Sequence, residues 1–461
     1  MNNWKNYIET NNSKTINDLV SFLRIPSISS LQEHKEDVNK AAIWVHQKLK
    51  EAKLENVEVM ETEGHPVVYA DWLHASTKPT ILIYGHFDVT ATGPSKEWNS
   101  PPFEPKIIDN KIFARGASDD KGNMLAPIVA VESLLETEEK LPVNIKFLFE
   151  GQEEIGSPNI EKFISENRTK LSCDLVISAD GNQWSETEPC LLLSLRGICA
   201  MQIDVFGPSI DLHSGIYGGT IQNPLHSLAI IIAGLHNRDG SISVEGFYND
   251  VVMPTQEYRN QIAKVPFDEQ TYLSLTGAPA LFGENGWSTR EREWIRPTLE
   301  INGMWGGFQG DGNKTVLPAS AHAKITCRLV ANQEPKNILK LIDQHIKKYS
   351  SPEIRVKTTL STVYGTPYSV DSEHPGNLAA SRVLKNIYGK TPYLCGSGGS
   401  IPICSFFKEQ LQAVTIGFSF ALDDEGAHGP NEFFRLTSLK KSQEAYCLLL
   451  KEIAISWQKG N

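Results

Sequence analysis

Short apolar runs alternate with amphipathic stretches over the first 180 residues. The runs of strand character cover residues 66–72, 80–86, 144–151 and 174–180. The stretches with apolar positions at helical spacing cover residues 15–24, 36–53 and 122–138. Strands that alternate with helices predict an α/β domain with a mainly parallel, buried central sheet. Ligands of such sheets bind beyond the carboxyl ends of the strands.

The pattern changes near residue 191, where a long strand-like run with partial alternation begins. Gly-rich loops, helical patterns at 224–238 and 335–349, and strand patterns at 320–330 and 353–365 follow it. An alternating α/β pattern returns towards the C-terminus. We therefore expect one domain built from residues 1–196 and 376–461, with a second, α+β domain of residues 197–375 inserted into it.

Composition narrows the class of protein. A length of 461 residues exceeds one ordinary core, and 40% hydrophobic with 21% charged residues is typical of a soluble globular protein. A net charge of −11 argues against a nucleic-acid partner. Apolar stretches stay short of the roughly 18 residues of a membrane span, and the polar N-terminus has no signal core. The seven cysteines are scattered, without a C-x-x-C pair, which favours free thiols in a reducing cytoplasm.

Potential metal ligands follow the predicted strands. They are His86, Asp119, Glu153, Glu154 and Asp180, with His428 in a distant Gly-rich loop. Each has an ordinary explanation by itself, such as a helix N-cap, a surface acid pair or a turn. Together they form a set of nitrogen and oxygen donors that suits Zn²⁺, Co²⁺ or Mn²⁺, with enough carboxylates to bridge two ions. One of the paired glutamates could bind metal while the other acts as general base, and Asp88 could orient His86 through its second ring nitrogen.

Five ordered motifs carry a resemblance to a known family: GHFDV, ARGASDDKG, GQEEIGS, SADG and GAHGPNE. They resemble the co-catalytic metallopeptidases, the family of carnosinases, cytosolic non-specific dipeptidase, carboxypeptidase G, aminoacylase and succinyl-diaminopimelate desuccinylase. The motifs DLHSGIYGG, NKTVLP, CRLVANQEP and GGSIP are similar to those of the carnosinase and cytosolic dipeptidase branch. The resemblance implies a zinc-exopeptidase type of hydrolase fold, in which residues 197–375 form a lid and dimerisation domain.

The resemblance also implies a di-metal site. One ion is expected on His86, Asp119 and Asp180, and the other on Asp119, Glu154 and His428, with Asp119 as the bridge. Glu153 is expected to be the general base, and the peptide bond after Asp119 is expected to be cis. Two divalent ions per subunit follow, with Zn²⁺ expected and Mn²⁺ or Co²⁺ as alternatives.

Residues of the inserted domain and the GGSIP motif are expected to bind substrate. His213 would reach the partner subunit's site in a homodimer and stabilise the oxyanion, and Arg328 would bind the substrate carboxylate. Lesser expected contacts come from Asn223, Thr315, Gly399 and Ser400. For each of these residues an ordinary packing or turn-capping role remains the alternative.

The expected function is that of a metal-dependent dipeptidase, in which a metal-bridging hydroxide attacks the peptide bond of a dipeptide or short peptide. An Asp at position 180 favours peptidases within the family. The alternative is hydrolysis of N-acyl amino acids by the same site. A non-catalytic binding protein on a hydrolase scaffold is a minor alternative, since it predicts a broken ligand or base and every such position is intact.

Overall fold

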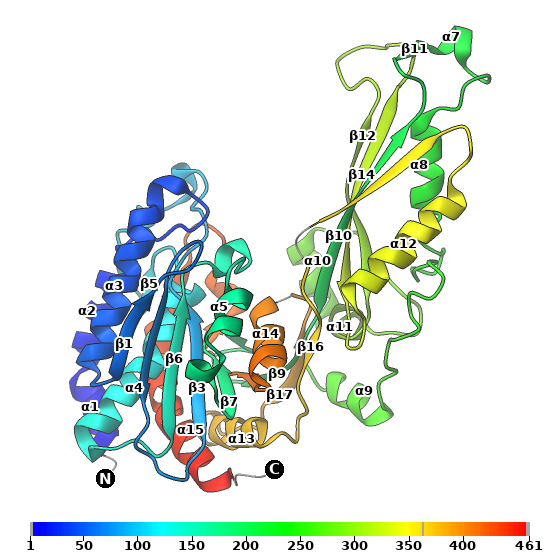
Figure 1. The fold of residues 1–461 in the computed structure, drawn as a ribbon. Coiled ribbons are helices and arrows are strands. Elements are labelled where there is room, and N and C mark those ends of the chain that lie inside the picture. Colours follow the sequence, from blue (N-terminus) through cyan, green and yellow to red (C-terminus); the bar gives the residue numbers. More distant parts are fainter. Residues whose placement is uncertain (1–2, 362–363, 400, 458–461) are drawn as a thin grey trace. The chain divides into compact units, whose positions relative to one another are not determined.

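A computed structural model describes residues 3–361, 364–399 and 401–457, and the chain forms two compact units (Figure 1). The first unit consists of Met1–Leu193, Val370–Leu394 and Phe406–Asn461, and the second of Ser194–Ser369 and Cys395–Ser405. Residues 395–405 thus belong to the second unit rather than to the expected C-terminal part of the first. The reason is a contact distant in sequence: the backbone N–H of Arg196 donates to the carbonyls of Ser397 (3.3 Å) and Gly399 (3.0 Å).

The first unit is built on a six-stranded sheet in the order β1-β2-β6-β3-β7-β18. Its strands are β1 (Glu55–Met60), β2 (Val67–Trp72), β3 (Thr80–His86), β6 (Asn144–Glu150), β7 (Leu175–Ser178) and β18 (Val414–Gly417). The four strands from β6 to β18 are parallel, while β1 and β2 add an antiparallel edge. The expected α/β fold class with a mainly parallel sheet is confirmed.

Helices flank this sheet. They are α1 (Asn3–Thr10), α2 (Asn12–Leu23), α3 (Lys35–Glu51), α4 (Gly122–Glu138), α5 (Ile160–Glu166), α6 (Arg168–Leu171), α13 (Pro375–Tyr388), α14 (Pro402–Leu411) and α15 (Leu436–Ser456). Every residue of α4 from Gly122 to Leu135 is buried, as expected for a helix that is apolar on all sides. The sequence pattern did not predict α1, a helix of only eight residues that buries Trp4 and Ile8.

A small sheet has the strand order β20-β5-β4. Strands β4 and β5 lie between β3 and α4 in the chain, and β20 comes from near the C-terminus. Its strands are β4 (Lys106–Ile108), β5 (Lys111–Phe113) and β20 (Phe433–Arg435). The sequence suggested that Asp119 follows a strand of the central sheet, but the structure shows that it does not. It lies in the turn between β5 and α4, and β20 pairs with β5 so that the C-terminal loop joins the same region.

The second unit has an antiparallel sheet in the order β12-β14-β10-β15. Its strands are β10 (Gly197–Phe206), β12 (Thr298–Gly306), β14 (Ser320–Leu329) and β15 (Arg355–Leu360). Helices α8 (Pro224–Ala233) and α12 (Pro335–Tyr349) contact one face (Figure 1). Alternate residues of β14, such as Ala321, Ala323 and Ile325, are buried in the core of this unit, which leaves the residues between them for the opposite face.

Shorter elements complete the described chain. They are β8 (Asn182–Gln183), β9 (Cys190–Leu195), β11 (Leu212–His213), β13 (Val316–Leu317), β16 (Tyr368–Ser369), β17 (Tyr393–Ser397), β19 (Ala421–Leu422), α7 (Ser214–Tyr217), α9 (Gln256–Ile262), α10 (Glu269–Thr276) and α11 (Thr289–Trp294). Among the residues described, none of the helices combines the length and the apolar character that a bilayer crossing requires.

Replacement of Ile83 by alanine should destabilise the first unit. Ile83 lies in the middle of β3 and is completely buried, so that Ile83→Ala leaves a cavity and should cost about 2–5 kcal/mol of unfolding free energy. Urea unfolding followed by circular dichroism measures the change. The matched control is Ile43→Ala on α3, where the side chain is 60% exposed and the expected change is within about 0.5 kcal/mol. Equal effects of the two substitutions would contradict the assignment of Ile83 to the core.

Candidate metal centre

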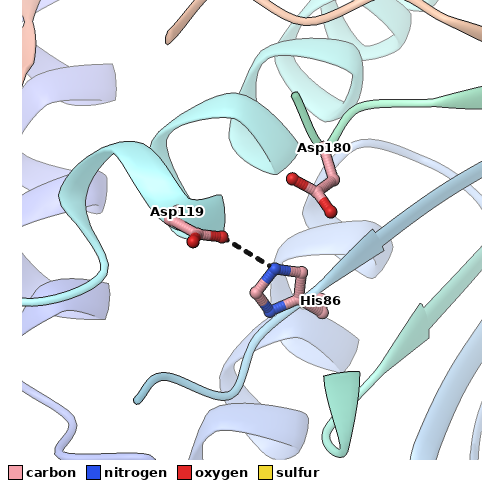
Figure 2. Close-up of side chains that lie close together, drawn as sticks. All are labelled: His86, Asp119 and Asp180. Atoms are coloured by element: carbon pink, nitrogen blue, oxygen red, sulfur yellow. Dashed lines mark hydrogen bonds and ion pairs between the residues drawn. The ribbon is translucent and has the colours of Figure 1, made fainter. Parts of the chain in front are cut away.

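His86 ends strand β3 and is fully buried. Its Nδ1 lies 3.1 Å from the backbone carbonyl oxygen of Asp88, which can only accept a hydrogen bond. In the neutral ring the proton therefore resides on Nδ1, and Nε2 presents its lone pair. That Nε2 atom lies 3.0 Å from Asp119 Oδ1 (Figure 2). The preceding residue must be glycine, because a Cβ on Gly85 would lie 2.7 Å from a carboxylate oxygen of Asp120.

The carboxylate of Asp119 faces two histidines with its two oxygens. Oδ1 faces His86, and Oδ2 lies 3.0 Å from Nε2 of His428. His428 Nε2 also lies 3.1 Å from Glu154 Oε2, while the other Glu154 oxygen accepts the backbone N–H of Thr90 at 3.0 Å. The peptide bond between Asp119 and Asp120 is cis.

The structure brings all five sequence-predicted ligands together in two groups. The first group is His86, Asp119 and Asp180 (Figure 2), and the second is Asp119, Glu154 and His428. Within each group one potential ligand atom per residue lies within 4.8 Å of the others. These are the two groups that the resemblance implied, with Asp119 common to both. His428 has a φ of 63°, an uncommon backbone conformation for a residue other than glycine, as is often found at functional sites.

The charge balance of the two groups fits divalent cations. Burial and the nearby charge of Asp119 raise the pKa of Asp180 to about 6. Burial also raises the pKa of Asp119, but hydrogen bonds from His428 and His86, which form when Nε2 of each ring carries a proton, outweigh it and hold that pKa below its ordinary value. The carboxylates of Asp119, Asp180 and Glu154 lie so close together that they repel one another unless positive charge lies between them. Imidazole nitrogens and carboxylate oxygens are ligands of Zn²⁺ and related borderline metals, so the donor set fits such ions.

Glu153 lies beside the two groups but belongs to neither. Burial raises its pKa well above the ordinary value; the charge of His86 opposes this shift, and the charges of Asp180 and Asp119 add to it. A buried glutamate with a raised pKa holds a proton more readily than an exposed one. Glu153 is therefore a buried carboxyl group beside the ligands, which is the position that a general base needs.

The position of Asp88 differs from the expectation. Its Oδ1 lies 3.4 Å from His86 Nδ1, which is farther than the backbone carbonyl of the same residue. The carboxylate instead accepts the backbone N–H groups of Glu153 (3.2 Å) and Glu154 (3.1 Å). Asp88 thus orients His86 mainly through its main chain, and its side chain holds the turn that carries the two glutamates.

Glu432 and Arg115 form a buried pair that sequence reasoning did not single out. Arg115 Nη1 donates to Glu432 Oε2 at 2.7 Å, and Arg115 Nη2 donates to the backbone carbonyl of His428 at 3.1 Å. The same glutamate accepts backbone N–H groups from Gly116 (2.8 Å), Ser118 (2.9 Å) and Asp119 (3.2 Å). This pair joins the turn of Asp119 to the loop of His428. Both residues lie inside the metal-site motifs ARGASDDKG and GAHGPNE, and this position is the one sequence feature that could have indicated their role.

The other predicted substrate residues lie in the second unit. His213 is exposed and caps α7, with its Nδ1 accepting the backbone N–H of Gly215 at 3.0 Å. In the neutral ring the proton is then on Nε2, which makes this atom a hydrogen-bond donor. Asn223 caps α8 through Leu225 N (2.9 Å), and the exposed Thr315 accepts Ser214 N through its carbonyl (3.1 Å).

Arg328 lies on β14 near a second arginine that the sequence analysis missed. Burial, and then the charge of Arg328, lower the pKa of Arg196 to about 10. Nε of Arg196 donates to the carbonyl of Gly398 at 3.2 Å, and its backbone N–H donates to Gly399. Two guanidinium groups and the Gly399 segment thus lie together within the second unit, while Ser400 lies outside the described residues.

Conversion of Glu432 to glutamine should weaken metal binding, because glutamine cannot balance the charge of Arg115 or accept the same set of N–H groups. We expect Glu432→Gln to lose about tenfold or more in metal affinity, measured by calorimetric titration of metal-stripped protein with Zn²⁺. The control is Glu132→Gln, which alters another buried glutamate that accepts from Tyr7 and Lys14. The interpretation fails if both variants bind Zn²⁺ as the parent protein does.

Comparison with known proteins places these features in a family. Residues 82–452 match the model of Peptidase family M20/M25/M40. The Cys-Gly metallodipeptidase dug1 of Schizosaccharomyces pombe is 31% identical over 395 residues, which cover 84% of this chain and 83% of that protein. The Beta-Ala-His dipeptidase of Homo sapiens is 30% identical over 374 residues, covering 80% of this chain and 73% of that protein.

A solved structure that is similar to this chain belongs to the same family as the sequence relatives. The M20 family metallo-carboxypeptidase Sso-CP2 of Sulfolobus solfataricus matches with a TM-score of 0.83 and 31% identity, and the match covers 96% of this chain and 99% of that chain. The resemblance to the co-catalytic metallopeptidases, and to their carnosinase and dipeptidase branch, is confirmed. The family model spans most of the chain and both candidate ligand groups, and the protein belongs to Peptidase family M20/M25/M40.

Proposed function

We propose that the protein is a metal-dependent dipeptidase that hydrolyses the peptide bond of dipeptides or short peptides. The observation that carries the proposal is the sharing of Asp119 between two ligand groups, with the carboxylate of Glu153 beside both groups but outside them. Two of the relatives described above are named as dipeptidases.

The first ion would be held by His86, Asp119 and Asp180, and the second by Asp119, Glu154 and His428. When bound, the two divalent ions lower the pKa of a water molecule and polarise the carbonyl of the scissile bond. Glu153 accepts the proton of the attacking water and returns it to the leaving amine. Asp88 keeps Glu153 in place, because its carboxylate accepts the backbone N–H of that residue.

Residues of the second unit bind the substrate in this proposal. Arg328, helped by Arg196, binds the terminal carboxylate of the substrate, since guanidinium groups match carboxylates in shape and charge. His213 donates from Nε2 to the developing oxyanion in the partner subunit of a homodimer. Asn223, Thr315 and Gly399 are proposed as lesser substrate contacts, and so is Ser400, which lies outside the described residues. The second unit then acts as the lid and dimerisation domain, and the first unit as the catalytic domain.

Two further properties belong to the proposal. Zn²⁺ is the resident metal, because the ligands are two histidines and three carboxylates, and Mn²⁺ or Co²⁺ can replace it. The protein works in the cytoplasm, which agrees with the free thiols of all seven cysteines.

A second candidate function is the release of an amino acid from a larger acyl group. The relative from Sulfolobus solfataricus is named a carboxypeptidase, and N-acyl amino acids present the same terminal carboxylate to Arg328. Dipeptides, longer peptides and N-acyl amino acids all need the same metal chemistry, so they differ only in the acyl group on the carbonyl side of the scissile bond.

Conversion of Glu153 to glutamine should abolish catalysis without loss of metal. Glutamine keeps the size of the side chain but cannot accept the proton, so Glu153→Gln should lower kcat by about 100-fold or more. Dipeptide turnover and metal content by atomic emission are measured on the same sample. The matched comparison is Glu154→Gln, which should lose metal as well as activity. Full activity of the Glu153 variant would show that another group is the base.

A substrate panel separates the candidate functions. Metal-reconstituted protein is assayed with dipeptides, tripeptides and N-acetyl or N-succinyl amino acids, and dipeptides should give the highest kcat/KM. Amidation of the C-terminal carboxylate should raise KM, since it removes the charge that Arg328 binds. Turnover of acyl amino acids alone would overturn the dipeptidase assignment.

A further inference from the structure

The open face of the second unit's sheet carries a serine, a histidine and an aspartate in contact. Ser320 Oγ lies 3.0 Å from His322 Nε2, and His322 Nδ1 lies 2.6 Å from Asp204 Oδ1. We propose that Ser320, His322 and Asp204 form a second, metal-independent nucleophilic site that cleaves small esters with an aromatic leaving group. It is independent of the dipeptidase site, whose expected ligands and base lie in the first unit.

Strand register explains why these three side chains meet. Ser320 and His322 are two residues apart on β14 and therefore lie on the same face, opposite to the buried Ala321 and Ala323. On the neighbouring strand β10, Asp204 stands directly opposite His322. The side chains across such a pair are close enough to contact.

The hydrogen bonds orient the imidazole for general-base catalysis. A carboxylate only accepts hydrogen bonds, so the proton of the neutral ring lies on Nδ1 and Nε2 accepts the hydroxyl proton of Ser320. Burial raises the pKa of Asp204, but hydrogen bonds from Gln202 (2.8 Å) and His322 outweigh it and keep this pKa below its ordinary value. Asp204 is thus an anion at neutral pH. A nucleophile, a base and a group that orients the base are the three parts of a serine hydrolase triad.

Aromatic rings flank the triad and define the class of substrate. Trp305 on β12 stands opposite His322 and stacks on its ring, with centroids 5.1 Å apart. Phe206 stands opposite Ser320 and meets the histidine edge-on, at 6.1 Å. The His322 side chain is 20% exposed, so a small molecule can reach it, and an aryl group can pack on the two rings. Lys324 Nζ lies 5.9 Å from the Trp305 ring, so a positive charge stands on the same face of the sheet.

The reaction balances with water as the only co-reactant. Ser320 Oγ forms a bond to the acyl carbon while its proton moves to His322 Nε2. The bond between the acyl carbon and the aryl oxygen breaks, and the aryl oxygen takes the proton from His322. Water then attacks the acyl-serine with His322 again as base, which releases the acid and restores the serine.

The test uses full-length protein stripped of metal by chelator, so that the metal centre does not contribute. Turnover of 4-nitrophenyl acetate is measured for the parent, Ser320→Ala, His322→Gln and Asp204→Asn proteins. Each variant should lose about 100-fold or more of the multiple-turnover rate. A fluorophosphonate probe should label the parent protein at Ser320, as mapped by mass spectrometry.

Controls separate this site from general surface reactivity and from misfolding. Thr326→Ala changes another hydroxyl on the same face of β14 and should retain esterase turnover, and so should Glu153→Gln. Circular dichroism establishes that each variant is folded. Folded Ser320→Ala protein with the parent's esterase rate, or labelling of the parent without modification of Ser320, would overturn the proposal. Retained dipeptide hydrolysis by metal-loaded Ser320→Ala protein is expected and would show that the two sites act separately.

Discussion

The two oxygens of the Asp119 carboxylate face two different histidines, and the metal centre depends on holding this one carboxylate in place. A side chain that serves two groups cannot move toward one without leaving the other. The constraint is met through the backbone, because the turn of Asp119 donates its N–H groups to the buried Glu432. Arg115 neutralises that glutamate and holds the His428 loop at the same time. A buried ion pair that is not itself a ligand therefore holds the turn of Asp119 against the loop of His428.

The groups proposed to move protons also depend on one residue, Asp88. Asp88 accepts the backbone N–H groups of Glu153 and Glu154, so one carboxylate positions both the proposed base and a proposed ligand. Its main-chain carbonyl selects the tautomer of His86. Burial raises the pKa of Glu153 above that of an exposed glutamate.

The predictions from sequence succeeded where the signal was local. Apolar runs of strand length located β2, β3, β6 and β7 to within one or two residues, and helical spacing located α4 and α12. They failed where contacts between distant segments decide the structure. Asp119 follows a small sheet completed by β20 from the far end of the chain, and residues 395–405 join the second unit through Arg196. No periodicity within either segment reports such a contact.

The fold class, the candidate ligands and the family could all be predicted from the sequence, because periodicity and short motifs are local properties of the chain. The role of each atom became clear only from the folded structure. It divided the oxygens of Asp119 between two histidines, gave the carboxylate of Asp88 to the turn of Glu153 and brought Arg196 close to Arg328. It also set Asp204 opposite His322. Each of these depends on strand register or loop contacts between residues far apart in the chain, and such pairings exist only once the chain has folded.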